Sequence, residues 1–342
     1  MFLGMAYHPD YWPKERWPID ARLMAECHIE AVRVGEFAWC RFEPREGQLD
    51  FSWMDEAVDV FARQGIKTIM CTPTATPPAW LTHQHPEILP VDEHGLLAKR
   101  FGSRRHYCCN ARVYQAYTRR IVEAMAAHYG ANANIIGWQI DNEVGNVYRL
   151  EKGRCYCESC RKGFAVWLQR KYGSLEELNR AWGTVFWSQE YSDWEQIVLP
   201  QRGTAGEGLS PSHVLDFCRF SSDSWSEYTR LQAEIIRKYA QGQWVSTNFA
   251  CGLGQDKDLA DGPLYQAPCC WFPCIVDWGV LSRSLDFPGW SSHVGGMAAS
   301  LSADFLRGLK PDGQFAVLEG GGTRLGSYQP IAHGALGLAP FT

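Results

Sequence analysis

The segment that decides the fold is residues 135–145, IIGWQIDNEVG. It begins as an apolar run at 135–140 with the composition of a buried β-strand. It ends in three consecutive polar residues, Asp141, Asn142 and Glu143. A turn would explain this ending, because Asp and Asn are common turn residues. A functional site at the end of the strand is the alternative, and the rest of the chain distinguishes the two interpretations.

Short apolar segments alternate with amphipathic segments along the chain, which indicates βαβ units and a parallel sheet. A doubly wound sheet is the alternative, but no glycine-rich phosphate loop follows the first apolar segment. We therefore predict an α/β fold, a (β/α)8 TIM barrel that forms a single catalytic domain over residues 1–342. Its eight expected strands, of which 274–278 is the weakest, lie at 2–7, 30–37, 67–74, 135–140, 243–249, 274–278, 314–319 and 334–341.

Two carboxylates follow strands of this predicted barrel. Glu143 comes after the apolar run at 135–140, and Glu319 ends the run QFAVLE at 314–319. Active sites of these barrels lie at the C-terminal ends of the strands, so both side chains are expected at one mouth. Two carboxylates that face each other across a cleft are what glycoside hydrolysis requires. The structural alternative is that each Glu caps a strand end or forms a salt bridge there.

Composition excludes several classes of protein. The chain has 342 residues, 46% of them hydrophobic and 21% charged, as expected for a globular protein with a large core. Its formal net charge of −5 gives no basic surface for nucleic acid. The first residues, MFLGMAYHPDYW, contain no basic segment and no long apolar run. We therefore expect no nucleic-acid partner, no membrane span and a cytoplasmic location.

A cluster of thiols follows the polar residues that end the segment at 135–145. Cys155, Cys157 and Cys160 form a C-x-C-x-x-C pattern, which indicates a metal site in a protein with reduced thiols. Zinc takes four ligands, so one is missing locally. The stretch HYCCN at 106–110 offers Cys108 or Cys109 as the fourth. Reduced thiols without a metal are the alternative.

Long motifs give the chain a resemblance to a known family over nearly its whole length. They are YHPDYWP, VRVGEFAWCRFEPREGQLDF, PTATPPAWL, GSRRHYCCN, WQIDNEVG, AWGTVFWSQ and RGLKPDGQFAVLE. These motifs resemble glycoside hydrolase family 42, the bacterial β-galactosidases. The resemblance implies a retaining hydrolase that cleaves terminal β-D-galactosides, or the related α-L-arabinopyranosides, by double displacement. It assigns Glu143 as general acid/base and Glu319 as nucleophile, and it places Asn142, Arg104 and Trp187 in the sugar site. A surface Arg104 and a core Trp187 are the structural alternatives.

The resemblance also completes the metal site. The position matching Cys108 supplies a ligand in the family, which implies a four-cysteine zinc site made of Cys108, Cys155, Cys157 and Cys160. A closed shell of four thiolates leaves no open position for water, so this zinc is expected to be structural, and catalysis needs no cofactor. Family members are usually trimers, although the parts needed for trimerisation are expected to lie outside this chain.

Three departures from the family stand out. Residues 262–293 do not match, which a divergent insertion or a reading-frame slip would explain. After the nucleophile, Gly320 stands where the family has Gln, and Ser327 stands roughly where it has a Trp of the sugar subsite. The chain ends at Thr342, so we expect the end of the barrel to be incomplete and the family's C-terminal domains to be absent. The alternative function is therefore an inactive or weakly sugar-binding truncated barrel that retains a structural zinc site.

Overall fold

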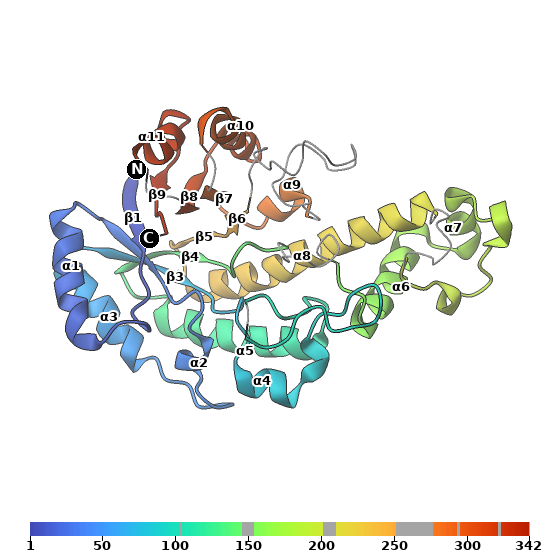
Figure 1. The fold of residues 1–342 in the computed structure, drawn as a ribbon, viewed down its shortest axis with the longest axis horizontal. Coiled ribbons are helices and arrows are strands. Elements are labelled where there is room, and N and C mark those ends of the chain that lie inside the picture. The colour runs from blue at the N-terminus through green and yellow to red at the C-terminus, as the bar shows by residue number, and fades with distance from the viewer. Residues whose placement is uncertain are drawn as a thin grey trace.

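The nine described strands form one parallel sheet (Figure 1). The computed structural model describes residues 1–102, 104–145, 154–200, 210–250, 276–292, 295–320 and 323–341. Hydrogen-bonded neighbours follow the order β5-β4-β3-β2-β1-β9-β8-β7-β6. The strands are β1 (Phe2–Ala6), β2 (Ala31–Val34), β3 (Lys67–Cys71), β4 (Ile135–Gln139), β5 (Trp244–Ser246), β6 (Asn248–Phe249), β7 (Gly289–Ser292), β8 (Ala316–Gly320) and β9 (Gly337–Leu338).

The sheet closes through one extended stretch of chain. β5 and β6 stand at the two ends of the strand order, yet only Thr247 separates them in the sequence. β5 pairs in parallel with β4, and β6 pairs in parallel with β7. Because β5 and β6 together occupy one barrel position, the sheet has eight positions. The predicted α/β class and (β/α)8 TIM barrel are confirmed. β9 pairs with both β1 and β8, but this strand has only two residues, which fits the expected incomplete C-terminal end of the barrel.

One predicted strand is wrong. The weakest expected strand, 274–278, is not a strand over the residues that the structure describes, because α9 begins at Trp278. The Asp277 side chain caps that helix by accepting a hydrogen bond from the Val280 N–H at 3.0 Å. The barrel strand at this position is β7, Gly289–Ser292, which lies between β6 and β8. Residues 262–275 and 293 of the divergent segment lie outside the described residues.

The helices cover the outside of the barrel. In α3, the buried residues 53, 54, 57, 58 and 61 recur at helical spacing, so one face packs on the sheet. Within the described ranges, no helix is long and apolar enough to cross a bilayer. The helices are α1 (Trp17–Glu26), α2 (Trp39–Phe42), α3 (Ser52–Arg63), α4 (Ala79–Gln84), α5 (Arg112–Tyr129), α6 (Glu158–Tyr172), α7 (Leu175–Trp182), α8 (Pro211–Tyr239), α9 (Trp278–Ser282), α10 (Gly296–Arg307) and α11 (Arg324–Ala332).

Helices α6, α7 and the start of α8 extend away from the barrel (Figure 1). The buried Asp216 of α8 joins them, because its carboxylate accepts hydrogen bonds from Tyr172 Oη at 2.6 Å and Trp182 Nε1 at 3.1 Å. Lys171 and Arg219 pair with the same carboxylate. These contacts hold the pKa of Asp216 below its ordinary value although burial raises it. Two hydrogen-bond donors and two cations around this one buried carboxylate therefore join α6, α7 and α8.

Close packing between two strands explains a glycine in β4. A Cβ added at Gly137 would lie 2.1 Å from the ring of Trp244 in β5. Real Cβ atoms do not approach an aromatic ring so closely, so only glycine fits against this indole. Gly137, in the segment at 135–145, therefore allows β4 to pack against Trp244 of β5.

Candidate active site and thiol cluster

The residues after β4 form a strained, buried turn. Asp141, Asn142 and Glu143 are 0–1% exposed. Asp141 and Glu143 have positive φ angles of 54° and 48°. This left-handed region is uncommon for Glu, and holding a residue there costs roughly 1–3 kcal/mol. Such outliers concentrate at functional sites, where the surrounding structure fixes them.

Asp141 supplies much of the support for this turn. Its carboxylate accepts hydrogen bonds from Thr74 Oγ1 at 2.6 Å, Tyr107 Oη at 2.8 Å and the Asn142 N–H at 2.7 Å. Burial raises the pKa of Asp141, while these hydrogen bonds oppose the rise. Asp141 therefore works as a structural anchor for the turn that carries Asn142 and Glu143.

Asn142 links three sequence-distant parts of the site. Its Nδ2 donates to Glu36 Oε1 at 2.8 Å and to Glu319 Oε2 at 3.2 Å. Its Oδ1 accepts from Arg104 Nη1 at 2.7 Å. The amide is therefore fixed in one orientation. The structure thus brings together Asn142, Glu319 and Arg104, three of the residues predicted from the sequence.

Glu143 lies against two arginines. Arg105 Nη1 donates to Glu143 Oε2 at 2.8 Å, and Arg104 Nη2 lies 3.4 Å from the same oxygen. The Glu143 N–H donates to Asn248 Oδ1 at 2.9 Å. Arg105 is 1% exposed, whereas the side chain of Arg104 is 34% exposed. Arg104 is thus the arginine that a ligand in the mouth can reach.

Glu319 has a different environment at the end of β8. Its Oε2 accepts from Asn248 Nδ2 at 2.7 Å as well as from Asn142. Arg33, which is buried and pairs with Glu36, places Nη2 3.8 Å from the same oxygen. Asn248 therefore contacts both acidic residues, through the backbone of Glu143 and the side chain of Glu319. The Glu143 carboxylate therefore lies against two guanidinium groups, whereas the Glu319 carboxylate accepts from two amides and has one guanidinium group, that of Arg33, farther away.

Sequence reasoning missed four residues of this network. Arg105 and Glu36 lie inside the quoted motifs GSRRHYCCN and VRVGEFAWCRFEPREGQLDF, yet nothing in their spacing shows that they contact Glu143 and Asn142. Arg33 lies inside a β-strand where every residue is buried. Glu36 and Asn248 do carry a signal, because each is a polar residue near the end of a predicted strand, 30–37 and 243–249, as Glu319 is at 314–319.

Trp187 is not brought to the carboxylates within this chain. It lies in a 3-10 turn, Phe186–Ser188, that follows α7 in the extension. It is 62% exposed and has a positive φ of 60°. Its described ring contact is with Phe186, at 4.8 Å between centroids. A core position for Trp187 does not fit this exposure, and its predicted place in the sugar site stays a prediction.

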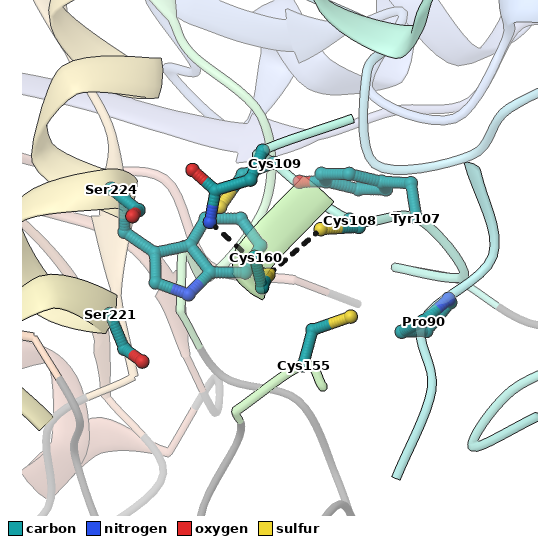
Figure 2. Close-up of a pocket in the computed structure, with 10 residues that line it drawn as sticks. Pro90, Tyr107, Cys108, Cys109, Cys155, Cys160, Ser221 and Ser224 are labelled. Carbon is teal, nitrogen blue, oxygen red and sulfur yellow. Dashed lines mark hydrogen bonds between the residues drawn. The ribbon is translucent and has the colours of Figure 1, made fainter. Parts of the chain in front are cut away.

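The four predicted cysteines converge. The sulfur atoms of Cys108, Cys155, Cys157 and Cys160 all lie within 4.8 Å of one another. Cys108 Sγ is 3.5 Å from Cys160 Sγ and 3.6 Å from Cys157 Sγ. Figure 2 shows Cys108, Cys155 and Cys160 around one pocket, with Tyr107 beside Cys108. Cys109 is not part of this group, so the structure selects Cys108 as the fourth member.

The donor set and its spacing fit a zinc ion. Four sulfurs at a Zn–S distance of about 2.3 Å lie roughly 3.8 Å apart in a tetrahedron. Hydrogen bonds with the other three thiols, led by Cys108, lower the pKa of Cys157. The same network, led by Cys155, raises the pKa of Cys108. A cation among the four sulfurs would favour the thiolate forms that bind zinc.

Backbone and amide donors already surround these sulfurs. The Val91 N–H donates to Cys155 Sγ, and Asn110 Nδ2 donates to Cys160 Sγ, both at 3.4 Å. N–H groups that point at sulfur stabilise thiolate ligands. The loop that carries Cys108 also carries Arg104 and Arg105, so the cluster and the carboxylate site share one segment of chain.

The fold and the site define a class: a (β/α)8 barrel with two buried carboxylates at the C-terminal ends of its strands, the arrangement that glycoside hydrolysis uses. The sequence model of glycoside hydrolase family 42, described as beta-galactosidase, matches residues 6–317, and the chain belongs to this family. The resemblance noted from the motifs is thereby confirmed.

Individual relatives agree with this assignment. A beta-galactosidase of Thermus thermophilus is 46% identical over 291 residues, which cover 85% of this chain and 41% of that protein. Beta-galactosidase BgaH of Haloferax lucentense is 40% identical over 317 residues, 91% of this chain and 44% of that protein. The chain therefore spans less than half the length of these two relatives.

Solved structures match the fold. The crystal structure of beta-galactosidase from the psychrophilic Marinomonas ef1 superposes with a TM-score of 0.86 at 32% identity, over 99% of this chain and 54% of that chain. The beta-galactosidase of Halorubrum lacusprofundi gives a TM-score of 0.86 at 33% identity, over 99% of this chain and 52% of that one.

Proposed function

We propose that this chain is the catalytic barrel of a retaining β-galactosidase. The observation that carries the proposal is the meeting of Glu143 and Glu319 at the barrel mouth. They come from different strand ends, and Asn142 and Asn248 join them. The family relatives support galactosides as the substrate class, because the matched proteins are named beta-galactosidases.

The two carboxylates divide the reaction between them. In the first step a Glu319 oxygen attacks the anomeric carbon, the bond to the leaving oxygen breaks, and Glu143 gives that oxygen its proton. In the second step Glu143 takes a proton from water. The water oxygen bonds to the anomeric carbon, and the bond to Glu319 breaks. Two inversions at one carbon give net retention of configuration.

Polar neighbours position the sugar in this scheme. Asn142 contacts the 2-hydroxyl of the sugar, an interaction that strengthens in the transition state. Its fixed amide orientation, between Glu36 and Arg104, supports this role. Arg104 binds the sugar from the accessible side of the mouth. Trp187 belongs to the sugar site by family resemblance, although its contacts in this chain lie within the extension.

The thiol cluster is proposed to hold a structural Zn2+ ion. Cys108, Cys155, Cys157 and Cys160 would supply a closed shell of four sulfurs, so the ion contributes stability and takes no part in bond making. It would tie the loop of residues 104–109 to the segment after β4. The carboxylate chemistry itself needs no cofactor.

The remaining assignments follow from the family and the composition. We propose one catalytic domain over residues 1–342 that acts on a β-galactoside or related sugar, with no nucleic-acid partner. A cytoplasmic location agrees with a cluster of reduced thiols. A trimer is the expected assembly of the family, and the segments that would form it are proposed to lie outside this chain.

Covalent trapping tests the central role directly. A 2-deoxy-2-fluoro β-galactoside with a dinitrophenyl leaving group should form a stable glycosyl-enzyme, because fluorine slows both steps and the good leaving group speeds only the first. Peptide mass mapping should find the added sugar on Glu319, and the Glu319→Gln variant should stay unlabelled. Labelling at another carboxylate would overturn the assignment of the nucleophile. Galactose binding without labelling or turnover would favour a sugar-binding barrel.

A further inference from the structure

An unpaired histidine lies at the mouth of the barrel, outside the machinery assigned so far. His8 follows β1 by two residues. Both of its ring nitrogens are buried, and neither has a hydrogen-bond partner among the described residues. The same short loop carries Asp10, whose Oδ1 is also buried without a partner in the described part of the chain. Buried polar groups usually find partners, so an unsatisfied imidazole needs an explanation.

Aromatic neighbours fix the plane of this ring. His8 stacks on Phe37 at 6.0 Å between centroids with 9° between planes, and on Tyr11 at 5.3 Å with 26°. Phe341 meets it edge-on at 5.7 Å. Phe37 follows β2, and Phe341 follows β9, the two strands that flank β1. The imidazole is therefore held by three adjacent strand ends and has little freedom to turn toward a protein partner.

The charges of the candidate active site act on His8. Burial lowers its pKa, while Glu36, Asp10 and Glu319 oppose that shift. A lowered pKa means a neutral imidazole near pH 7, which offers one N–H donor and one lone-pair acceptor. A sugar hydroxyl is also both a donor and an acceptor. The chemistry of the ring therefore matches a hydroxyl and does not require a charged ligand.

We propose that His8 is a substrate-binding residue that hydrogen-bonds a galactoside hydroxyl other than the 2-hydroxyl. The inference rests on the proposed function, in which Asn142 of the β4 end takes the 2-hydroxyl. His8 enters the mouth from β1, between β9 and β2, so it meets a different edge of the sugar ring. Sugar binding would satisfy a donor and an acceptor that have no partner among the described residues, and such sites discriminate against ligands that lack the hydroxyl.

Calorimetric titration with galactose and with 3-, 4- and 6-deoxygalactose tests the inference. His8→Phe keeps an aromatic ring in the same stack but removes both nitrogens. It should weaken galactose binding about tenfold. One of the three deoxy sugars, the one that lacks the hydroxyl bound by His8, should bind to the wild-type chain about tenfold less tightly than galactose. That deoxy sugar and galactose should bind equally well to His8→Phe. His94→Gln, at a side chain 69% exposed, is the matched control and should bind every sugar like the wild type.

Two results would overturn the inference in distinguishable ways. Binding by His8→Phe within twofold of wild type for all four sugars would reject His8 and leave the proposed function standing. Failure of the wild-type chain to bind or hydrolyse any galactoside would reject the proposed function and the inference together. If His8→Phe does not fold, imidazole nitrogen NMR of the wild-type chain decides. The His8 signals, assigned with His8→Gln, should shift with galactose, and unchanged signals would reject the role.

Discussion

Acidification should loosen the helical extension through one buried histidine, His213 of α8. His213 is 7% exposed and stacks on Trp182 at 4.8 Å between centroids and on Phe164 at 5.8 Å. Its Nε2–H donates to the backbone oxygen of Val198 at 2.9 Å. Burial lowers the pKa of His213 from 6.5 to about 4, although the Val198 hydrogen bond and the charge of Asp216 oppose that shift.

The size of the effect follows from this pKa difference. The folded-state pKa lies below the unfolded-state value, so the unfolded chain binds the proton first. The stability that neutral His213 contributes is therefore complete above pH 6.5 and is lost as the pH falls from 6.5 toward 4. Between pH 7 and pH 4.5 this single group should remove about 2.5 kcal/mol from the free energy of unfolding.

The assay is urea unfolding, followed by tryptophan fluorescence, of the wild type and His213→Phe at both pH values. The variant keeps an aromatic ring in the stack and loses about 1 kcal/mol at pH 7 with the hydrogen bond to Val198. On acidification it should lose about 2.5 kcal/mol less than the wild type, because it has no proton to bind. His94→Gln, at an exposed site, should follow the wild type. Equal acid sensitivity of His213→Phe and wild type would refute the reasoning.

Three further predictions concern packing, metal and charge. Gly137→Ala should lower the free energy of unfolding by about 2 kcal/mol or more, measured with urea, because its Cβ would overlap Trp244; unchanged stability would contradict the strand packing. Elemental analysis should find one zinc per chain, and Cys157→Ser should lose the zinc and melt roughly 5 °C or more below wild type; a metal-free wild type that melts like the variant would contradict the zinc site. Glu36→Gln should destabilise the fold by about 3 kcal/mol or more, because it uncouples buried Arg33; a loss below 1 kcal/mol in thermal or urea unfolding would contradict this charge compensation.

The sequence was most informative about the residues that end the barrel strands. Glu143, Asn142 and Glu319 were predicted to meet because parallel strands of one barrel end at one mouth. Asn142 does contact Glu319, and Asn248 bonds both the Glu143 N–H and the Glu319 carboxylate. The local Cys pattern likewise identified three of the four clustered thiols. The choice of Cys108 over Cys109 came from the family resemblance, and the structure agrees with it.

Other features could not be predicted because their causes are not local. β7 has the sequence GWSS, which is short and poor in β-branched residues, so its strand character comes from pairing with β6 and β8. The contacts of Arg105 with Glu143 and of Glu36 with Asn142 join residues 38 and 106 positions apart. The setting of the His8 ring likewise depends on Phe341, which lies near the other end of the chain.

The most direct test of the account is hydrolysis of a nitrophenyl β-galactoside by the wild type, Glu143→Gln and Glu319→Gln. With an active wild type, Glu319→Gln should lose turnover by roughly 10⁴-fold or more, because no glycosyl-enzyme can form. Glu143→Gln should lose less with this substrate, because nitrophenolate leaves without a proton, and added azide should restore part of its rate as a β-galactosyl azide. Variants that both turn over like an active wild type would contradict the assignment of Glu143 and Glu319.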